Sequence, residues 1–176
     1  MPTLGEVIRH KPCFLLPSVR KPRYVATPAL KASNIMYSRI LVALENGPAD
    51  ETLLPHISRL ARHFNSRLIL LHVADGWAAR NYNSLRLAES EEMRSDRAYL
   101  EDMALKLRTE GLDVSTQLAM GSPPEEILKT AVAADCDLIA MTSHGHRIIG
   151  DLLYGSTIDR VRHRTAIPIL TVRAGT

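Results

Sequence analysis

Short apolar runs alternate with amphipathic stretches from residue 37 onward, and this alternation limits the possible folds more than any other feature. Largely apolar runs occupy residues 40–44, 68–73, 137–142 and 167–172, a pattern typical of strands buried on both faces. Residues 112–118 alternate with period two, which favours a half-exposed edge strand. Strands separated by helices predict an α/β domain with a parallel sheet and right-handed crossovers.

The intervening segments carry the periodicity and the boundaries of helices. Four helices are expected. The first follows the turn at 45–48, and the second contains the apolar stripe 93–107. The third opens at 121–126, and the fourth runs from about 156 to 163. Gly111 is placed to stop the second helix. Pro55 lacks an N–H group, so we expect it to loosen the first helix near its start.

Residues 1–36 differ in composition from the rest of the chain. They hold five of the ten prolines and show neither helical nor alternating periodicity. Their only apolar cluster, at 13–16, is too short for the core of a secretory signal peptide. We therefore expect a basic, disordered N-terminal extension over 1–36, with Met36 as the natural start, and one domain over 37–176. A targeting segment is the alternative left open.

The charge of the chain is divided unevenly, and this division bears on its partners. Residues 1–36 carry six basic residues and one acid, whereas the remaining 140 residues carry 16 basic and 18 acidic residues. The net charge of +3 therefore comes from the extension, and aromatic residues make up only 5% of the chain. Both facts argue against a surface that binds nucleic acid.

Cysteine usage and hydropathy limit the compartment. Cys13 and Cys136 show no metal-binding or redox spacing, which favours a reducing compartment. No apolar run approaches the ~20 residues of a transmembrane helix. We expect a cytoplasmic protein without a membrane partner.

Ligands of parallel sheets bind at the carboxyl ends of the strands, where the strand order reverses. This rule points to residues 45–47, 72–76 and 142–156. Gly145 follows a strand, and Gly155 precedes Ser156 at a helix mouth, where backbone N–H groups favour an anion. The alternative left open is that Gly145 only serves a turn and that Ser156 is an ordinary N-cap.

Several motifs occur together in one order. They are Glu45-Asn46-Gly47, Leu71-His72-Val73, Met141-Thr142-Ser143-His144-Gly145, Gly155-Ser156 after nine further residues, and Ile167-Pro168-Ile169-Leu170-Thr171-Val172. In this order they resemble the universal stress protein family over about residues 37–173. The resemblance implies a Rossmann-like, adenine nucleotide alpha-hydrolase-like fold. Its five parallel strands would lie in the order 3-2-1-4-5 with helices on both faces. It also implies a homodimer paired through the C-terminal edge strand.

One branch of that family binds ATP through the motif G-x2-G-x9-G-[ST]. Gly145, Gly155 and Ser156 match the last three positions, and Val73 falls where the family offers main-chain groups to adenine. The resemblance thus implies a stress-response regulator that binds ATP with Mg²⁺. The implied nucleotide-binding residues are Ala43, Glu45, Val73, Met141, Thr142, His144, Gly145, Gly155, Ser156 and Thr157.

Two residues depart from the pattern of the ATP-binding branch. Thr142 replaces the first glycine, where its side chain would crowd the ligand or its hydroxyl would donate a hydrogen bond. Glu45 replaces an aspartate that lies near the nucleotide in the family, and its side chain reaches one methylene further. The alternative to a contact with the nucleotide is that Glu45 only stabilises the N-terminus of the first helix. Because of these departures, the second hypothesis is a nucleotide-free dimer that acts as a scaffold or protective binding protein.

No catalytic residue is predicted. His72, His144 and His146 lack the spacing of a zinc site, and we expect them to be surface or phosphate-proximal residues. Slow hydrolysis of ATP, or autophosphorylation at Ser156 or Thr157, is the catalytic alternative left open.

Overall fold

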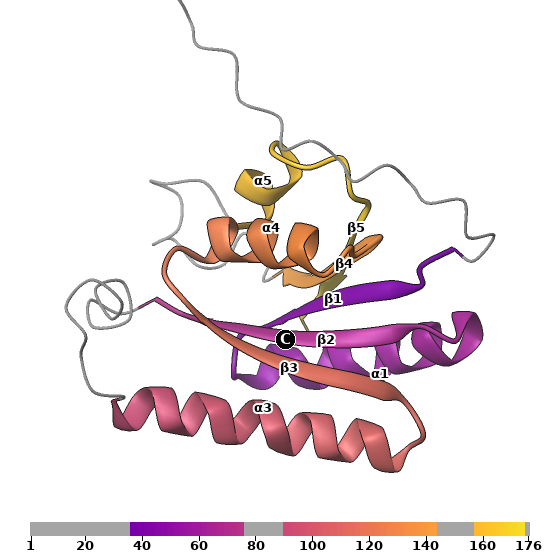
Figure 1. The fold of residues 1–176 in the computed structure, drawn as a ribbon, viewed down its shortest axis with the longest axis horizontal. Helices are drawn as coiled ribbons and strands as arrows, with labels where there is room; N and C mark the ends of the chain where they lie inside the picture. The colour runs from indigo at the N-terminus through magenta and orange to yellow at the C-terminus, as the bar shows by residue number, and fades with distance from the viewer. Residues whose placement is uncertain (1–35, 76–89, 144–156, 175–176) are drawn as a thin grey trace, which may run out of the picture.

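The described strands form one five-stranded sheet, and helices cover both of its faces (Figure 1). This computed structural model describes residues 36–75, 90–143 and 157–174, so the expected extension lies, apart from Met36, outside the described residues. In chain order the elements are β1 (Arg39–Leu44), α1 (Pro48–Phe64), β2 (Arg67–Ala74), α3 (Glu91–Thr109), β3 (Asp113–Met120), α4 (Pro123–Ala133), β4 (Leu138–Ser143), α5 (Thr157–Arg162) and β5 (Ile169–Arg173).

The strands lie in the order β3-β2-β1-β4-β5, and all four neighbouring pairs are parallel. This order confirms the fold that the sequence predicted. The chain moves from β1 outward to β2 and β3, and then returns to the other side of β1 for β4 and β5. The strand order therefore reverses between β1 and β4, which is where ligands of such sheets bind.

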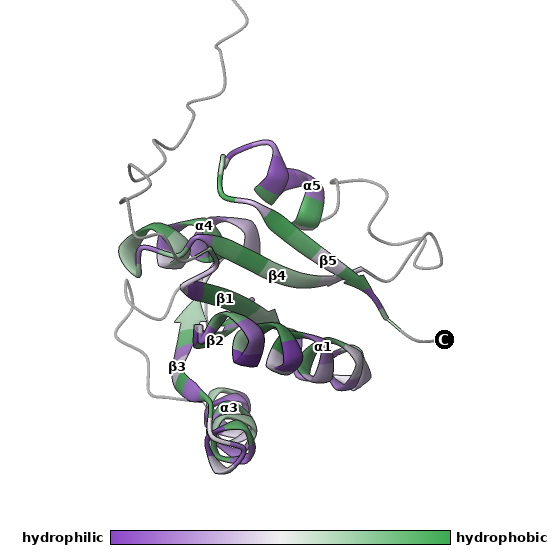
Figure 2. Ribbon diagram, turned by 90° about the vertical axis from the view of Figure 1, so that its right-hand side faces the viewer, coloured by the Kyte–Doolittle hydropathy of each residue, from purple (hydrophilic) through white to green (hydrophobic). Residues whose placement is uncertain are grey.

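Two apolar layers hold the helices against the sheet, as Figure 2 shows from the side. One buried cluster joins α1 and α3 to one face, and it contains Ile40, Val42, Leu53, Ile57, Leu100 and Ala104. The other joins α4 and α5 to the opposite face, and it contains Leu41, Ile127, Leu128, Ile139 and Val161. Successive residues of β1 thus enter different clusters, which explains its continuous apolar run.

Pro55 does not loosen the first helix as the sequence led us to expect. The helix α1 runs without a break from Pro48 to Phe64, with Pro55 inside it. The residues two before and two after it, Leu53 and Ile57, are fully buried in the core cluster. Packing on both sides of the proline therefore keeps the helix continuous, although Pro55 cannot donate its backbone hydrogen bond.

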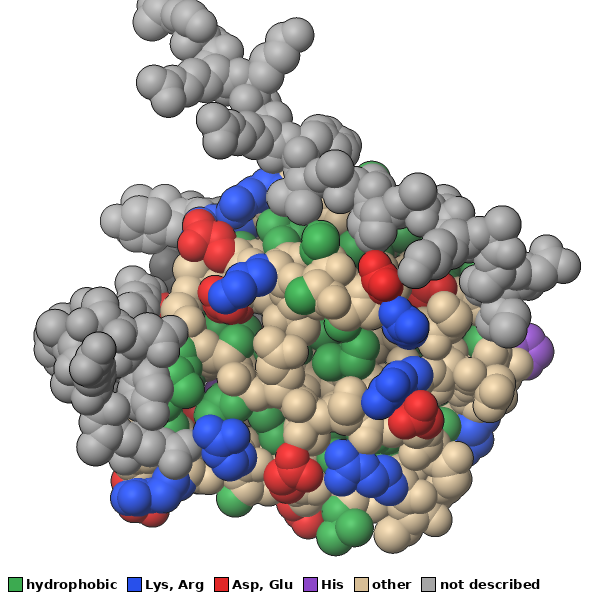
Figure 3. Space-filling view, viewed as in Figure 1, with side chains coloured by type: hydrophobic (Ala, Val, Ile, Leu, Met, Phe, Trp, Pro, Cys, Tyr) green, Lys and Arg blue, Asp and Glu red, His purple; other side chains and the backbone are tan. Residues whose placement is uncertain are grey.

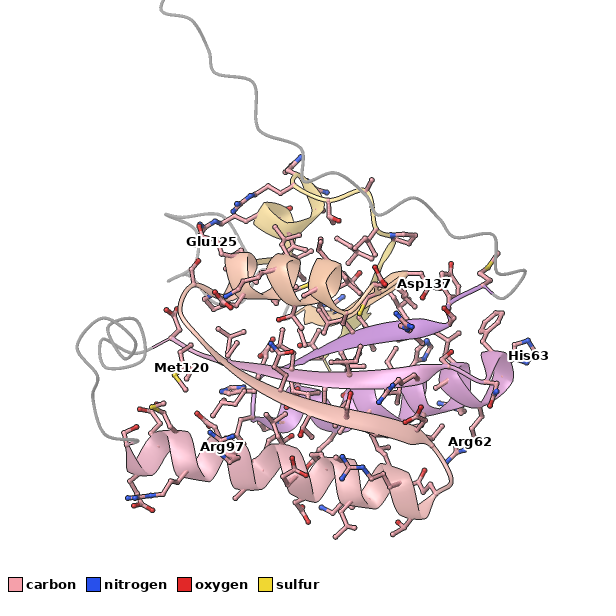
Figure 4. All side chains as sticks on the ribbon, viewed as in Figure 1. Arg62, His63, Arg97, Met120, Glu125 and Asp137 are labelled. Carbon is pink, nitrogen blue, oxygen red and sulfur yellow. The ribbon has the colours of Figure 1, made fainter. Side chains whose placement is uncertain are left out.

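Asp137 joins the amino ends of β1 and β4. Its carboxylate accepts hydrogen bonds from the backbone N–H groups of Ser38 at 2.7 Å and Arg39 at 2.9 Å. Figure 4 labels Asp137 at one end of the sheet and Met120, the last residue of β3, at the other. The contact fixes the two strands in a register that pairs Val42 with Ala140. Continued by two residues, that register brings Leu44 level with Thr142.

The described surface carries mixed charge. On the face seen in Figure 3, lysine and arginine side chains are interspersed with aspartate and glutamate and do not gather into one basic patch. Across residues 36–75, 90–143 and 157–174, no helix has the length and apolar content that crossing a membrane requires.

Candidate functional site

Glu45 and Thr142 meet at the point where the strand order reverses. Glu45 follows the last residue of β1, and Thr142 is the penultimate residue of β4. The Thr142 hydroxyl donates a hydrogen bond of 2.7 Å to Oε1 of Glu45 across 97 residues of sequence. Thr142 is only 4% exposed, whereas Glu45 lies on the surface. The two residues that depart from the family pattern are thus in direct contact.

Asp50 holds the loop that carries Glu45. Its carboxylate accepts hydrogen bonds from the backbone N–H groups of Glu45 at 3.1 Å, Asn46 at 2.9 Å and Gly47 at 3.4 Å. Asn46 takes a left-handed conformation with φ 58°, which turns the loop so that these groups converge. Asp50 occupies the first turn of α1 and is 1% exposed. It therefore fills the role at this helix start that was the alternative for Glu45.

This arrangement decides what the loop after β1 offers a ligand. Three successive backbone N–H groups can form an anion-binding nest when they face outward. Here all three are directed to the Asp50 carboxylate. The loop presents the Glu45 carboxylate instead, which accepts hydrogen bonds and repels anions. The described part of the site is therefore suited to hydroxyl or amino groups rather than to phosphate.

A second polar network joins this loop to β2 and α3. Asn46 donates through its side-chain amide to Oδ1 of Asp96 at 2.9 Å. The other carboxylate oxygen of Asp96 lies 3.5 Å from Nε2 of His72. Nδ1 of His72 lies 2.9 Å from the carbonyl oxygen of Leu44, and because a carbonyl only accepts, Nδ1 carries the proton. The end of β1, its loop and α3 thus share one set of contacts.

His72 is not the surface residue that was one of the two roles expected for it, and its proximity to phosphate stays a prediction. Its side chain is 13% exposed and lies between Leu44 and Asp96.

Sequence reasoning also missed Asp50, Asp96 and Tyr99. A signal existed for Asp96, because it falls three residues after Met93 and four before Leu100 on the buried stripe of α3. An acid at such a position indicates a buried polar contact.

Tyr99 completes the surroundings of Asp50. Its hydroxyl donates a hydrogen bond of 2.9 Å to Oδ2 of Asp50. Burial is the largest cause that raises the pKa of Tyr99 well above its usual value, and the hydrogen bond to Asp50 and the nearby negative charges of Asp50, Glu51 and Asp102 raise it further. The protonated phenol is thus a stable donor to the buried carboxylate.

Replacing Tyr99 with phenylalanine should lower stability and change its dependence on pH. At pH 7 we expect a loss of about 1–2 kcal/mol, because Asp50 loses a hydrogen bond. Above pH 10 the unfolded wild-type chain releases the Tyr99 proton while the folded chain keeps it, so wild-type stability falls as the pH rises. Tyr99→Phe should therefore show a shallower decline in urea unfolding from pH 9 to 11. The control Tyr37→Phe should keep the wild-type slope. Equal slopes for wild type and Tyr99→Phe would contradict this assignment.

The structure brings three further predicted site residues together. Ala43, Val73 and Met141 all belong to the apolar layer beneath α4 and α5. Met141 is only 5% exposed. Val73 lies one residue past the last position of β2 that is paired to β1, and it is still paired to β3. These residues therefore share the face of the sheet that α4 and α5 cover, and Met141 directly precedes Thr142 in β4.

The remaining predicted residues belong to the segment that joins β4 to α5. Thr157 is the first residue of α5 and is half-buried. Its neighbour Ile158 packs on the same apolar layer as Val73 and Met141. His144, Gly145, Gly155 and Ser156 lie outside the described residues. The glycine motif therefore remains a prediction from the sequence.

Comparisons with known proteins agree on one family. The model of the universal stress protein family matches residues 36–173. Universal stress protein MJ0577 of Methanocaldococcus jannaschii is 28% identical, over 80% of this chain and 97% of the relative. The solved structure of MJ0577 superposes with a TM-score of 0.66 at 27% identity, over 81% of this chain and 99% of that one.

Two more distant structures share the fold. A universal stress protein in complex with cAMP superposes with a TM-score of 0.61 at 17% identity, over 80% of this chain and 99% of that one. The universal stress protein from Archaeoglobus fulgidus in complex with dAMP gives a TM-score of 0.57 at 19% identity, over 77% of this chain and 98% of that one. At these identities the likeness concerns the fold.

Proposed function

Because this chain belongs to the universal stress protein family, we propose that it is a stress-response regulator that binds an adenine nucleotide, namely ATP with Mg²⁺, at the carboxyl ends of β1 and β4. The observation that carries the proposal is the contact between Glu45 and Thr142 at the reversal of the strand order. Ligands of parallel sheets bind at this place.

The residues around that contact match the parts of a nucleotide in chemistry. Ala43, Val73 and Met141 are apolar residues on the face of the sheet that α4 and α5 cover, and we place adenine on that side. The Glu45 carboxylate suits the hydroxyl groups of ribose. The phosphates, together with Mg²⁺, would be bound by the segment of Gly145 and Gly155, because the N–H groups after β1 are engaged by Asp50. The cAMP and dAMP complexes of the two structural neighbours support an adenine nucleotide.

Thermal stabilisation by nucleotides tests the proposal. A ligand at ten times its Kd stabilises the folded state by about 1.4 kcal/mol, which raises the Tm by several degrees. We expect 5 mM ATP with Mg²⁺ to produce such a shift, and 5 mM GTP to produce a smaller one. Equal shifts with ATP and GTP, or no shift with either nucleotide, would overturn the proposal.

A specific observation favours a second candidate function. Thr142 places a buried, β-branched side chain where the ATP-binding branch has a glycine. If that side chain excludes the ligand, the protein acts instead as a nucleotide-free dimeric scaffold or protective binding protein. The thermal-shift measurement separates the two functions, because a scaffold of this kind gains no stability from ATP.

Both functions include a homodimer formed through β5. This strand lies at the edge of the sheet, and among the described strands it pairs only with β4. Ile169, Leu170 and Val172 are half-buried in the single chain, and an apolar edge of this kind is usually covered by a partner. Light scattering after size exclusion should give about twice the chain mass of 19.5 kDa. A mass of one chain at micromolar concentration would contradict the dimer.

We place the protein in the cytoplasm. Cys136 is a free cysteine that is 2% exposed. Burial, followed by the charge of Asp137, raises the pKa of its thiol to about 12. The thiol is therefore protonated and inert at neutral pH. The placement rests on the two cysteines of the sequence, which show no disulfide or redox spacing.

A further inference from the structure

Glu45 is held by hydrogen bonds at its backbone and at the end of its side chain. Its backbone N–H donates to Asp50, and its Oε1 accepts the Thr142 hydroxyl at 2.7 Å. Asp50 and Thr142 are 1% and 4% exposed, so both anchors are themselves fixed in the core. A glutamate on the surface otherwise loses considerable rotamer freedom when it binds a ligand. Here that freedom is already restricted in the folded protein.

The direction of the hydrogen bond determines what the pair can bind. A carboxylate only accepts hydrogen bonds, so Thr142 must donate its single hydroxyl proton to Glu45. Toward a ligand the pair therefore offers acceptors: the lone pairs of the carboxylate and of the threonine oxygen. The groups of ATP that donate to such acceptors without carrying negative charge are the two ribose hydroxyls and the 6-amino group of adenine, and of these we assign the ribose hydroxyls to the pair. A carboxylate at the end of a strand is a known type of partner for a ribose hydroxyl.

We propose that Thr142 is a positioning residue that fixes the Glu45 carboxylate for the ribose hydroxyls, and that it thereby makes the protein select ribonucleotides over deoxyribonucleotides. The inference rests on the proposed function, since it concerns the same site. In this role Thr142 acts through its hydroxyl group and does not crowd the ligand. A charge-assisted hydrogen bond of this length is strong enough to orient a surface carboxylate.

The test compares ATP with 2′-deoxyATP and 3′-deoxyATP, each with Mg²⁺, by calorimetry on the full chain. For the wild type we expect at least one deoxy analogue to bind about 10-fold more weakly than ATP, which corresponds to about 1.4 kcal/mol. Thr142→Val keeps the shape of the side chain and removes the hydroxyl. It should reduce that difference to less than about 2-fold. Thr142→Ser restores the hydroxyl and should restore the discrimination.

Glu45→Gln provides a variant that leaves Thr142 unchanged. It replaces the charged acceptor with a weaker one, so we expect it to lose most of the discrimination as well. This variant decides the result if Thr142→Val fails to bind ATP or to fold.

The failures of the inference and of the proposed function can be told apart. A wild-type protein that binds none of the three nucleotides overturns both. A wild-type protein that binds all three equally overturns the inference alone. Retained discrimination in Thr142→Val or in Glu45→Gln also overturns the inference alone.

Discussion

Asp50→Ala should destabilise the folded domain by about 3 kcal/mol, the largest loss that we expect from one polar substitution. The Asp50 carboxylate is 1% exposed and accepts hydrogen bonds from three backbone N–H groups and from the Tyr99 hydroxyl. Hydrogen bonds to a charged group each contribute about 1.5–3 kcal/mol, and groups left without a partner inside the protein add a further cost. Solvation of the surface loop offsets part of the total. Urea denaturation followed by circular dichroism measures the change.

Glu51→Ala is the matched control for this substitution. Glu51 is also acidic and occupies the same first turn of α1, but it lies on the surface. Its replacement should change the free energy of unfolding by about 0.5 kcal/mol or less. A similar loss in both variants would mean that charge at the helix N-terminus, rather than the hydrogen bonds of Asp50, stabilises the loop. A loss under about 1 kcal/mol for Asp50→Ala would contradict the role assigned to it.

Gly155→Val should abolish detectable ATP binding. In the sequence motif Gly155 precedes Ser156 at the expected N-terminus of the last helix. A β-branched side chain there would keep phosphate away from the backbone N–H groups that favour an anion. We expect a loss of affinity of at least about 100-fold, which corresponds to about 2.7 kcal/mol and exceeds the range of calorimetry for a weak ligand.

Gly150→Val is the control for Gly155→Val, because Gly150 lies in the same segment but outside the motif. It should bind ATP with an affinity within about 3-fold of the wild type. Wild-type affinity in Gly155→Val would show that the motif does not bind the phosphates. A loss of binding in both variants would mean that the segment tolerates no added side chain, and the motif would then carry no special role.

The arrangement of strands followed from the sequence because it depends on simple patterns. The continuous apolar run of β1 reflects burial on two faces, with Ile40 in one cluster and Leu41 in the other. The period-two pattern of β3 reflects its place at the edge of the sheet. Both signals are local in sequence. For Pro55 two local signals disagreed, because its missing N–H group favours a loosened helix whereas the spacing of Leu53 and Ile57 favours a continuous apolar stripe, and both of these residues are buried.

The polar contacts of the site were harder to predict. The sequence identified Glu45 and Thr142 separately, as two departures from a motif. It gave no sign that they touch, since 97 residues separate them. Their contact follows from the register of β1 against β4, which Asp137 fixes at the other end of the sheet. Asp50 was missed because an aspartate in the first turn of a helix is usually a surface residue. Tyr99 was missed because 49 residues separate it from its partner Asp50.

Calorimetric titration of the full-length wild-type protein with ATP and Mg²⁺ tests the central claim most directly. We expect measurable heat, one nucleotide per chain and a Kd on the order of 10–500 μM, equivalent to about −7 to −4.5 kcal/mol. That affinity is weak because the Glu45 carboxylate repels the phosphates and Asp50 engages the backbone N–H groups of the loop after β1. Absence of heat at millimolar ATP, together with no rise in Tm under the same conditions, would contradict nucleotide binding and leave the dimeric scaffold as the function of this protein.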